Sequence, residues 1–289
     1  MISAVLIVKN EEELLSRCLD SLKGIGEIVI TDTGSEDKTK EIARKYTDKI
    51  FDFPWIDSFC QARNFSNSKA TGDWILTIDA DEQLLTPVSE IESLLSGGEV
   101  FNVRVVDGQG NEHRAPRLFK RDENIFWRGD IHESLSKVGE RDIPVVIQYG
   151  SSPAHAKDPD RNLRILRKSL RVNPRLTRER YYLAREYFYR KEWERAIEEL
   201  DRYLRTAKWR PEVNDAWLMR ARCLSGLGRW EDAVDSAWQA LKYNANFREA
   251  LDFVAQHMDP KNKLRWESFA QLADNDGVLF TRDIIKQRS

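Results

Sequence analysis

The sequence places carboxylates where a strand is predicted to end. Asp79 and Asp81 directly follow Trp74–Ile78, an apolar run typical of a buried strand. Two carboxylates at such an edge can project toward one site, where they suit Mg²⁺ or Mn²⁺, and the ion in turn could hold a diphosphate. Taken alone, an Asp-x-Asp pair is also common in solvated turns. Its position after the apolar run favours the metal-binding interpretation.

Two further polar segments could bind a nucleotide. Asp32 follows the predicted strand 27–31 and could accept a hydrogen bond from a base N–H, while a glycine two residues later permits a tight turn. The next helix, with Ser35 as its predicted N-cap, offers free backbone N–H groups. Arg63, on the predicted helix 58–70, could donate to a nucleotide carbonyl or phosphate. An ordinary helix cap and a solvated arginine are the alternatives.

The elements that must position these residues alternate between strand and helix. The predicted strands are 4–8, 27–31, 49–53 and 74–78, and the predicted helices are 11–22, 36–46 and 58–70. This alternation indicates βαβ units and a mostly parallel sheet, in which ligands bind at the carboxyl ends of the strands. The polar clusters at 9–10, 32–35 and 79–81 all fall at such ends. Residues 100–149 are strand-like, with a hairpin turn at 107–111, and we assign them to the acceptor side of the same domain.

From residue 160 onward the pattern is helical and repetitive. Three pairs recur 37 residues apart, namely Ala184/Ala221, Trp193/Trp230 and Ala196/Ala233. A helix-turn-helix repeat near 34 residues is the tetratricopeptide pattern, here lengthened at 207–212. We predict repeats near 177–210 and 214–247, with capping helices after 247. An unrelated helical bundle is the alternative.

Overall composition limits the class of protein. Charged residues make up 33% of the chain and hydrophobic residues 41%, a core-forming composition that excludes collagen-like and wholly disordered chains. No apolar run approaches the roughly 20 residues that span a bilayer, and the first strand is too short for a signal peptide. Three widely separated cysteines fit a reducing compartment. We therefore expect a cytoplasmic protein, and the oligomeric state stays open.

The net charge of −2 hides an asymmetry between the two halves. Residues 1–150 carry −9 and residues 151–289 carry +7, and the stretch 161–191 holds 11 basic residues against two acids. One face of the first predicted helix in this stretch is cationic, with Arg161, Arg164, Lys168 and Arg171. This face is either a solvated surface or a site for a polyanion such as nucleic acid, phosphorylated saccharide or an anionic lipid surface. Aromatic residues between 181 and 189 could stack on bases or belong to the repeat core.

The order of the motifs resembles the family 2 glycosyltransferases. The segments that carry the resemblance are VKNEEE, DTGSEDKT, ARN, WILTIDADE, PRLFK at 116–120 and WRGDIHE at 127–133. The segments look like those of bacterial and phage members that carry helical repeats after the catalytic domain. The resemblance implies a GT-A fold, which is Rossmann-like with a mixed, mostly parallel sheet, over residues 1–155. A helical tetratricopeptide-like domain would then occupy 156–289.

The resemblance also implies an activity and site residues. The family transfers a sugar from a nucleotide donor, usually UDP-linked, with inversion and usually with Mn²⁺ or Mg²⁺. By position, the implied donor-binding residues are Val8, Asn10 and Glu11 for the base and ribose, Asp32 for the base, Arg63 for the base or phosphates, and Asp79 near the ribose. Asp81 would ligate the metal that bridges the diphosphate, with His132 as a further metal or phosphate contact.

Inverting transfer is a single in-line displacement, so it makes two demands. Charge on the leaving diphosphate must be stabilised, and the acceptor hydroxyl must lose a proton to a carboxylate. We expect Glu133 to be this base, with Asp130 as the alternative, although Glu133 could also be structural. The expected sugar is glucose or a related hexose. The expected acceptor is a saccharide or lipopolysaccharide, a peptide or a modified nucleic acid. The competing hypothesis is a non-catalytic scaffold built on a decayed GT-A domain with protein-docking repeats.

Overall fold

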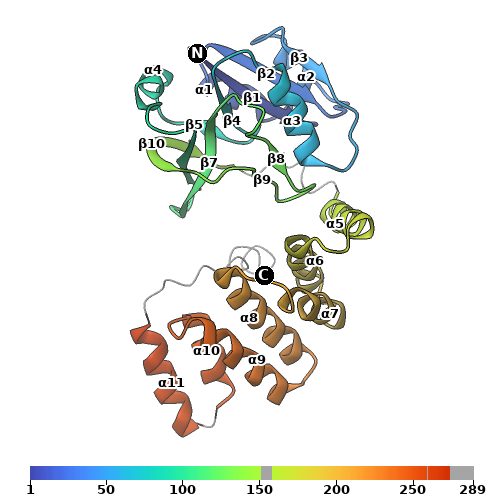
Figure 1. The fold of residues 1–289 in the computed structure, drawn as a ribbon, viewed down its shortest axis with the longest axis vertical. Helices are drawn as coiled ribbons and strands as arrows, with labels where there is room; N and C mark the ends of the chain where they lie inside the picture. Colours follow the sequence, from blue (N-terminus) through green and yellow to red (C-terminus); the bar gives the residue numbers. More distant parts are fainter. Residues whose placement is uncertain (151–157, 259, 274–289) are drawn as a thin grey trace. The chain divides into compact units, whose positions relative to one another are not determined.

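The computed structural model describes residues 1–150, 158–258 and 260–273, and it divides the chain into two compact units, Met1–Arg161 and Asn162–Ser289 (Figure 1). His155 lies outside the described residues. The resemblance to the family 2 glycosyltransferases implies a histidine near the end of the catalytic domain, and His155 is the candidate for that position.

A mixed sheet of eight strands forms the first unit, in the order β3-β2-β1-β4-β7-β6-β10-β5. The strands are β1 (Ile2–Val8), β2 (Glu27–Asp32), β3 (Ile50–Asp52), β4 (Trp74–Thr77), β5 (Gln83–Leu84), β6 (Val100–Val106), β7 (Glu112–Lys120) and β10 (Arg141–Gln148). Strands β7 and β5 run antiparallel to their neighbours, and the other pairs are parallel. The predicted mixed, mostly parallel sheet is therefore confirmed, as is the hairpin turn at 107–111 between β6 and β7.

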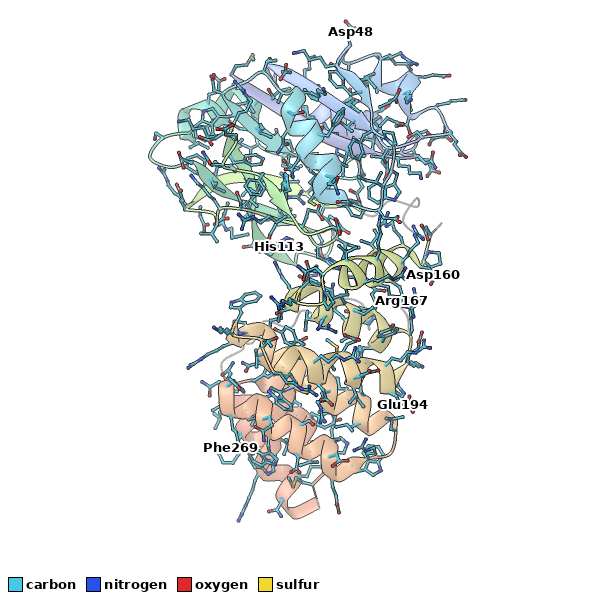
Figure 2. All side chains as sticks on the ribbon, turned by 45° about the vertical axis from the view of Figure 1, so that its right-hand side comes forward. Asp48, His113, Asp160, Arg167, Glu194 and Phe269 are labelled. Atoms are coloured by element: carbon cyan, nitrogen blue, oxygen red, sulfur yellow. The ribbon has the colours of Figure 1, made fainter. Side chains whose placement is uncertain are left out.

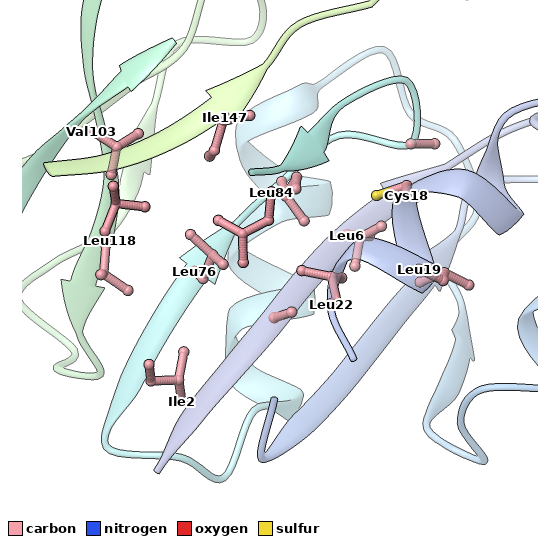
Figure 3. Close-up of a cluster of buried hydrophobic side chains, with 14 of the residues drawn as sticks. Ile2, Leu6, Cys18, Leu19, Leu22, Leu76, Leu84, Val103, Leu118 and Ile147 are labelled. Atoms are coloured by element: carbon pink, nitrogen blue, oxygen red, sulfur yellow. The ribbon is translucent and has the colours of Figure 1, made fainter. Parts of the chain in front are cut away.

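Helices and a small hairpin cover the sheet. These elements are α1 (Leu15–Ser21), α2 (Thr39–Ala43), α3 (Phe59–Lys69), α4 (Val88–Ile91), the 3₁₀ turn η1 (Glu92–Leu94) and the hairpin strands β8 (Trp127–Arg128) and β9 (Ser134–Leu135). Successive side chains of β1 point to opposite faces, so Leu6 and Val5 enter different hydrophobic clusters. Leu6 packs with Leu19 and Leu76, all at most 1% exposed (Figure 3). Burial on both faces fixes the strands whose ends carry the polar clusters.

One predicted helix start is wrong. Ser35 does not cap α2, because that helix begins at Thr39 and its N-cap position is Lys38. The Ser35 hydroxyl instead accepts a hydrogen bond from the backbone N–H of Asn10 at 2.9 Å. By contrast, Ser58 caps α3 and accepts from the backbone N–H of Gln61 at 3.4 Å.

The second unit consists of helices that pack in pairs. They are α5 (Arg161–Val172), α6 (Thr177–Tyr189), α7 (Trp193–Leu204), α8 (Arg210–Gly226), α9 (Trp230–Tyr243), α10 (Arg248–Gln256) and α11 (Pro260–Leu272). Helix α6 packs on α7, α8 on α9, and α10 on α11. The recurring alanines are all fully buried, at positions Ala184, Ala196, Ala221 and Ala233. This arrangement confirms the tetratricopeptide-like helical region. No helix in the described part of the chain is long and apolar enough to cross a membrane.

The aromatic residues of α6 are mostly core residues. Tyr181, Tyr182, Tyr187 and Phe188 are each at most 8% exposed. The Tyr181 hydroxyl donates to Asp215 at 2.5 Å, which satisfies its polar group inside the helix pairs. Of the two alternatives for these aromatic residues, the repeat core is therefore the one that holds for these four, because their side chains are buried inside the unit.

Candidate active site

The structure brings the predicted polar clusters to one edge of the sheet. Val8 and Asp32 are register partners at the carboxyl ends of β1 and β2, and the backbone N–H of Thr33 donates to the Val8 carbonyl at 2.9 Å. Strand β4 lies on the other side of β1 and ends at Thr77, two residues before Asp79. Side chains far apart in sequence therefore share the edge at which parallel sheets bind ligands.

The two oxygens of Asp32 have different surroundings. Oδ1 accepts from the backbone N–H groups of Gly34 and Ser35, both at 2.9 Å, and lies 3.7 Å from the Lys40 ammonium. Gly34 has a φ of 105°, a conformation that favours glycine. Oδ2 is buried and has no hydrogen-bond partner among the described residues. A buried acceptor without a partner is costly unless a ligand satisfies it.

The loops after β1 and β2 are tied together by reciprocal hydrogen bonds. The Asn10 side chain accepts from the backbone N–H of Glu36 at 2.8 Å, which complements the bond from Asn10 to Ser35. The backbone N–H of Glu11 donates to the Thr39 hydroxyl at 2.7 Å. Asn10 has a φ of 56°, so its backbone is held in a left-handed turn. These bonds give the predicted base and ribose residues Asn10 and Glu11 a fixed backbone.

A buried charge network joins the predicted donor and acceptor segments. Arg63 donates from Nε to Glu133 Oε1 at 2.6 Å and from Nη2 to Asp79 Oδ1 at 2.9 Å. Arg117 lies 3.5 Å from Asp79 Oδ2 and donates to Glu82 Oε1 at 2.8 Å. The remaining oxygen of Glu82 accepts from the backbone N–H of Asp79 at 2.9 Å. Arg63, expected at the donor base or phosphates, is thus paired with two protein carboxylates.

This network moves two neighbouring acids in opposite directions. Burial raises the pKa of Asp79, but Arg63 and Arg117 together outweigh burial and hold the pKa at about 2. Burial also raises the pKa of Glu82, and Arg117 opposes it less effectively, so the pKa reaches about 7. The two arginines therefore favour the ionised form of Asp79, whereas burial favours the protonated form of Glu82.

The hairpin that carries the predicted base is attached to α3. The Asn64 side chain exchanges two hydrogen bonds with the backbone of Trp127, at 2.9 and 2.8 Å, and the backbone N–H of Phe59 donates to the Asp130 carbonyl at 2.8 Å. The Arg63 guanidinium lies 5.2 Å from the centre of the Trp127 ring. Within the hairpin loop, His132 has a φ of 52°. Helix α3 therefore holds the predicted acceptor segment against the donor edge.

The residues near the Asp-x-Asp pair fit a diphosphate-bound metal. In the described ranges, no three His, Cys, Asp and Glu side chains gather into a ready-made metal site. Asp81 is 4% exposed, and Asp79 forms ion pairs with Arg63 and Arg117. Mg²⁺ commonly takes one or two protein carboxylates and completes its shell with phosphate oxygens and water. Asp81 fits this role, and a metal contact by His132 stays a prediction.

The predicted cationic face lies on α5. Arg164, Lys168 and Arg171 are exposed, while Arg161 is half-buried. Leu163, Leu166 and Leu170, on the opposite face, are at most 8% exposed and form the buried face of the helix. Arg167, on the same helix (Figure 2), donates to the Tyr187 hydroxyl at 3.1 Å. Whether the face binds a polyanion stays a prediction.

Sequence reasoning missed the role of Arg117. The residue belongs to the PRLFK segment, but nothing local connects it with Asp79 or Glu82. Antiparallel pairing makes the connection, since Ile75 pairs with Phe119 and Leu76 with Leu118. This register brings residue 117 to the end of β4. The sequence signal that could have revealed this role is an arginine next to two apolar residues, Leu118 and Phe119, which are buried in the structure. A charged side chain in a buried strand needs an oppositely charged partner inside the protein.

The fold and the carboxylate-bearing sheet edge define a GT-A-like domain. The family model described as glycosyl transferase family 2 matches residues 3–150, and the chain belongs to this family.

Similar proteins include a TPR repeat-containing protein of Synechococcus elongatus, 39% identical over 139 residues, which are 46% of this chain and 34% of the relative. The lipopolysaccharide core biosynthesis glycosyltransferase LpsC of Rhizobium meliloti is 29% identical over 172 residues, 58% of this chain and 51% of the relative. The chain thus spans between about a third and a half of the length of these relatives. Among solved structures, S. aureus TarS 1-349 in complex with UDP-GlcNAc has a TM-score of 0.49 at 12% identity, covering 84% of this chain and 92% of that one.

Proposed function

We propose that this chain is an inverting glycosyltransferase that moves a hexose from a UDP-sugar to an acceptor hydroxyl. The observation that carries the proposal is the sheet edge of a family 2 domain, where Asp32 and the Asp79–Asp81 segment stand at the carboxyl ends of the two strands that flank β1. Among the described residues, the buried Oδ2 of Asp32 has no hydrogen-bond partner. A nucleotide base supplies the N–H that this oxygen lacks. Val8, Asn10 and Glu11 line the rest of the base and ribose site.

Asp81 holds a divalent cation together with the donor diphosphate. When bound, Mn²⁺ or Mg²⁺ supplies positive charge that stabilises the leaving UDP. The chain's own contribution is to keep Asp79 ionised through Arg63 and Arg117, and to bury Asp81 at the strand end. His132 is a second contact to the metal or the phosphates.

Glu133 is the general base in this proposal. Its Oε1 is occupied by Arg63, whereas Oε2 has no hydrogen-bond partner among the described residues and can take the proton of the acceptor hydroxyl. Asp130 is the alternative, since it lies in the same loop. Transfer is then one displacement: the acceptor oxygen forms a bond to the anomeric carbon, the bond to the UDP oxygen breaks, and the proton goes to Glu133.

The acceptor that we propose is a saccharide. The function named for LpsC, lipopolysaccharide core biosynthesis, supports this choice for a chain that shares 58% of its length with that protein. The cationic face of α5 would contact phosphate groups on such an acceptor.

A donor panel tests the proposal. UDP-glucose, UDP-galactose, UDP-N-acetylglucosamine and GDP-mannose are incubated with the protein and Mn²⁺, and nucleotide release is measured. Slow release of UDP from at least one UDP-sugar, with none of GDP from GDP-mannose, is expected. Absence of both release and UDP binding would favour the scaffold hypothesis.

A further inference from the structure

We infer that Arg63 is a positioning residue that fixes the acceptor-side carboxylate Glu133 relative to the donor-side loop at Asp79. The inference rests on the proposed function, since it concerns the base of that reaction. It departs from the direct contact with the donor that the family resemblance implies for Arg63.

The guanidinium of Arg63 is placed to bridge two carboxylates. Its Nε and Nη2 donate to different acids, Glu133 at 2.6 Å and Asp79 at 2.9 Å, and its side chain is only 9% exposed. The ring of Trp127 lies 5.2 Å from its central carbon. A planar fork of donors can hold two acceptors at a set angle, which a lysine ammonium cannot do.

The donor side of this bridge is itself rigid. Arg117 approaches the second oxygen of Asp79 at 3.5 Å and pairs with the fully buried Glu82 at 2.8 Å. Glu82 in turn accepts from the Asp79 backbone at 2.9 Å. Asp79 is therefore held by its side chain and by its main chain, so Arg63 has a fixed anchor.

The acceptor side needs such an anchor because its hairpin is short. Strands β8 and β9 contain two residues each, and the hydrogen bonds from Asn64 and Phe59 hold the hairpin by its backbone. The bond from Arg63 acts instead on the Glu133 side chain and leaves Oε2 for the acceptor hydroxyl. A base displaced by about 1 Å loses on the order of a hundredfold in rate.

The test compares Arg63→Lys, Glu133→Gln and the double variant. UDP binding is measured by calorimetry with Mn²⁺, and kcat and KM are measured by UDP release. Arg63→Lys should lower kcat by about a hundredfold while the Kd for UDP stays within about twofold of wild type. The double variant should be little worse than Glu133→Gln, because both changes act through one carboxylate. Arg121→Lys is the matched control, since Arg121 donates to the Gly72 carbonyl at 2.7 Å and takes no part in the network.

Two results would overturn the inference. A tenfold weaker UDP affinity in Arg63→Lys with kcat retained would mean direct donor contact, and independent, multiplying losses in the double variant would remove the link to Glu133. Thermal unfolding checks that Arg63→Lys is folded, and Glu133→Gln probes the same contact with the arginine intact. If the wild-type protein neither binds UDP nor releases it, the proposed function fails and this inference fails with it.

Discussion

At the scale of single residues, Asp32 shows how one carboxylate can serve the fold and a ligand together. One oxygen organises the turn after β2, and the other is buried without a partner in the described part of the chain. The first role stabilises the loop, whereas the second leaves a desolvated acceptor. Structural need alone does not account for the second oxygen, so the residue is a direct test of nucleotide binding.

Asp32→Asn is predicted to weaken UDP binding while preserving the fold. The amide oxygen can still accept from Gly34 and Ser35, but an NH₂ donor replaces the free acceptor and would face the base N–H. The expected loss is about 1–3 kcal/mol, which is a Kd about 5- to 150-fold higher, measured by calorimetry. Asp48→Asn, an exposed aspartate (Figure 2), is the control and should bind as wild type does. Equal affinities for wild type and Asp32→Asn would exclude Asp32 from the base site.

At the scale of elements, Glu27 fastens the start of β2 to its neighbours. Its carboxylate accepts from the Ser3 hydroxyl, the Lys49 ammonium, and the backbone N–H and hydroxyl of Thr71. Burial raises the pKa of Glu27, but these donors outweigh it and lower the pKa to about 2. The contribution to stability is therefore complete above the unfolded pKa near 4.5 and is lost as the pH falls toward 2.

Glu27→Gln is accordingly predicted to destabilise the first unit in a pH-dependent way. At pH 7 the loss should be about 2–3 kcal/mol, and at pH 3 it should be less than half as large. Urea unfolding at both pH values measures the difference. Glu123→Gln, at an exposed position, should change stability little at either pH. A constant loss at both values would show that the charge on Glu27 is not what stabilises the strand.

The helix pairs depend on small residues at their crossings. Ala221 on α8 and Ala233 on α9 are fully buried in one hydrophobic cluster. Ala221→Leu should therefore destabilise the second unit by about 1–3 kcal/mol through overpacking, seen as a lower midpoint of thermal unfolding. Ala245→Leu, at an exposed position, serves as the control. An unchanged midpoint for Ala221→Leu would contradict close packing at this crossing.

Local pattern predicted the elements better than it predicted their pairing. The apolar periodicity of β1, β2 and β4 located the strands, and the polar residues after them marked the ligand edge. The local pattern failed at Ser35, whose hydroxyl bonds to the backbone of Asn10 and does not cap the helix. It also failed at Arg117, which lies near Asp79 because β7 pairs antiparallel with β4. Both failures involve contacts across many residues of sequence, which periodicity does not contain.

At the scale of the whole molecule, the near-zero net charge separates into an acidic family 2 domain and a basic helical region. The acidic half carries the carboxylates of the proposed donor site. In the helical region, Arg202 pairs with Glu198 within α7, and Arg229, the N-cap residue of α9, pairs with Asp232 in that helix. Exposed Arg171 on α5 makes no such ion pair within the described ranges, which supports a role for this face in binding an anion.

The double variant Arg164→Glu/Arg171→Glu is predicted to lower the rate of transfer to the acceptor and to leave hydrolysis of the donor unchanged. Transfer to a phosphorylated lipopolysaccharide-core oligosaccharide should fall about tenfold or more, because two attractive charges become repulsive. Donor hydrolysis without acceptor should stay unchanged. The dephosphorylated oligosaccharide is the control acceptor and should show little difference between variant and wild type. An equal loss of transfer and of donor hydrolysis would show that this helix face has a structural role and does not bind the acceptor.

The most direct test of catalytic UDP-sugar transfer is metal-dependent UDP release by wild type and by Asp81→Ala. The protein is incubated with the active UDP-sugar and Mn²⁺, before and after chelation, and UDP is quantified. We predict UDP release that chelation abolishes and that Asp81→Ala lowers by at least about a hundredfold. A thermal unfolding transition like that of wild type checks that the variant is folded. Release that is unaffected by both chelation and Asp81→Ala, or no release and no UDP binding by wild type, would contradict the account.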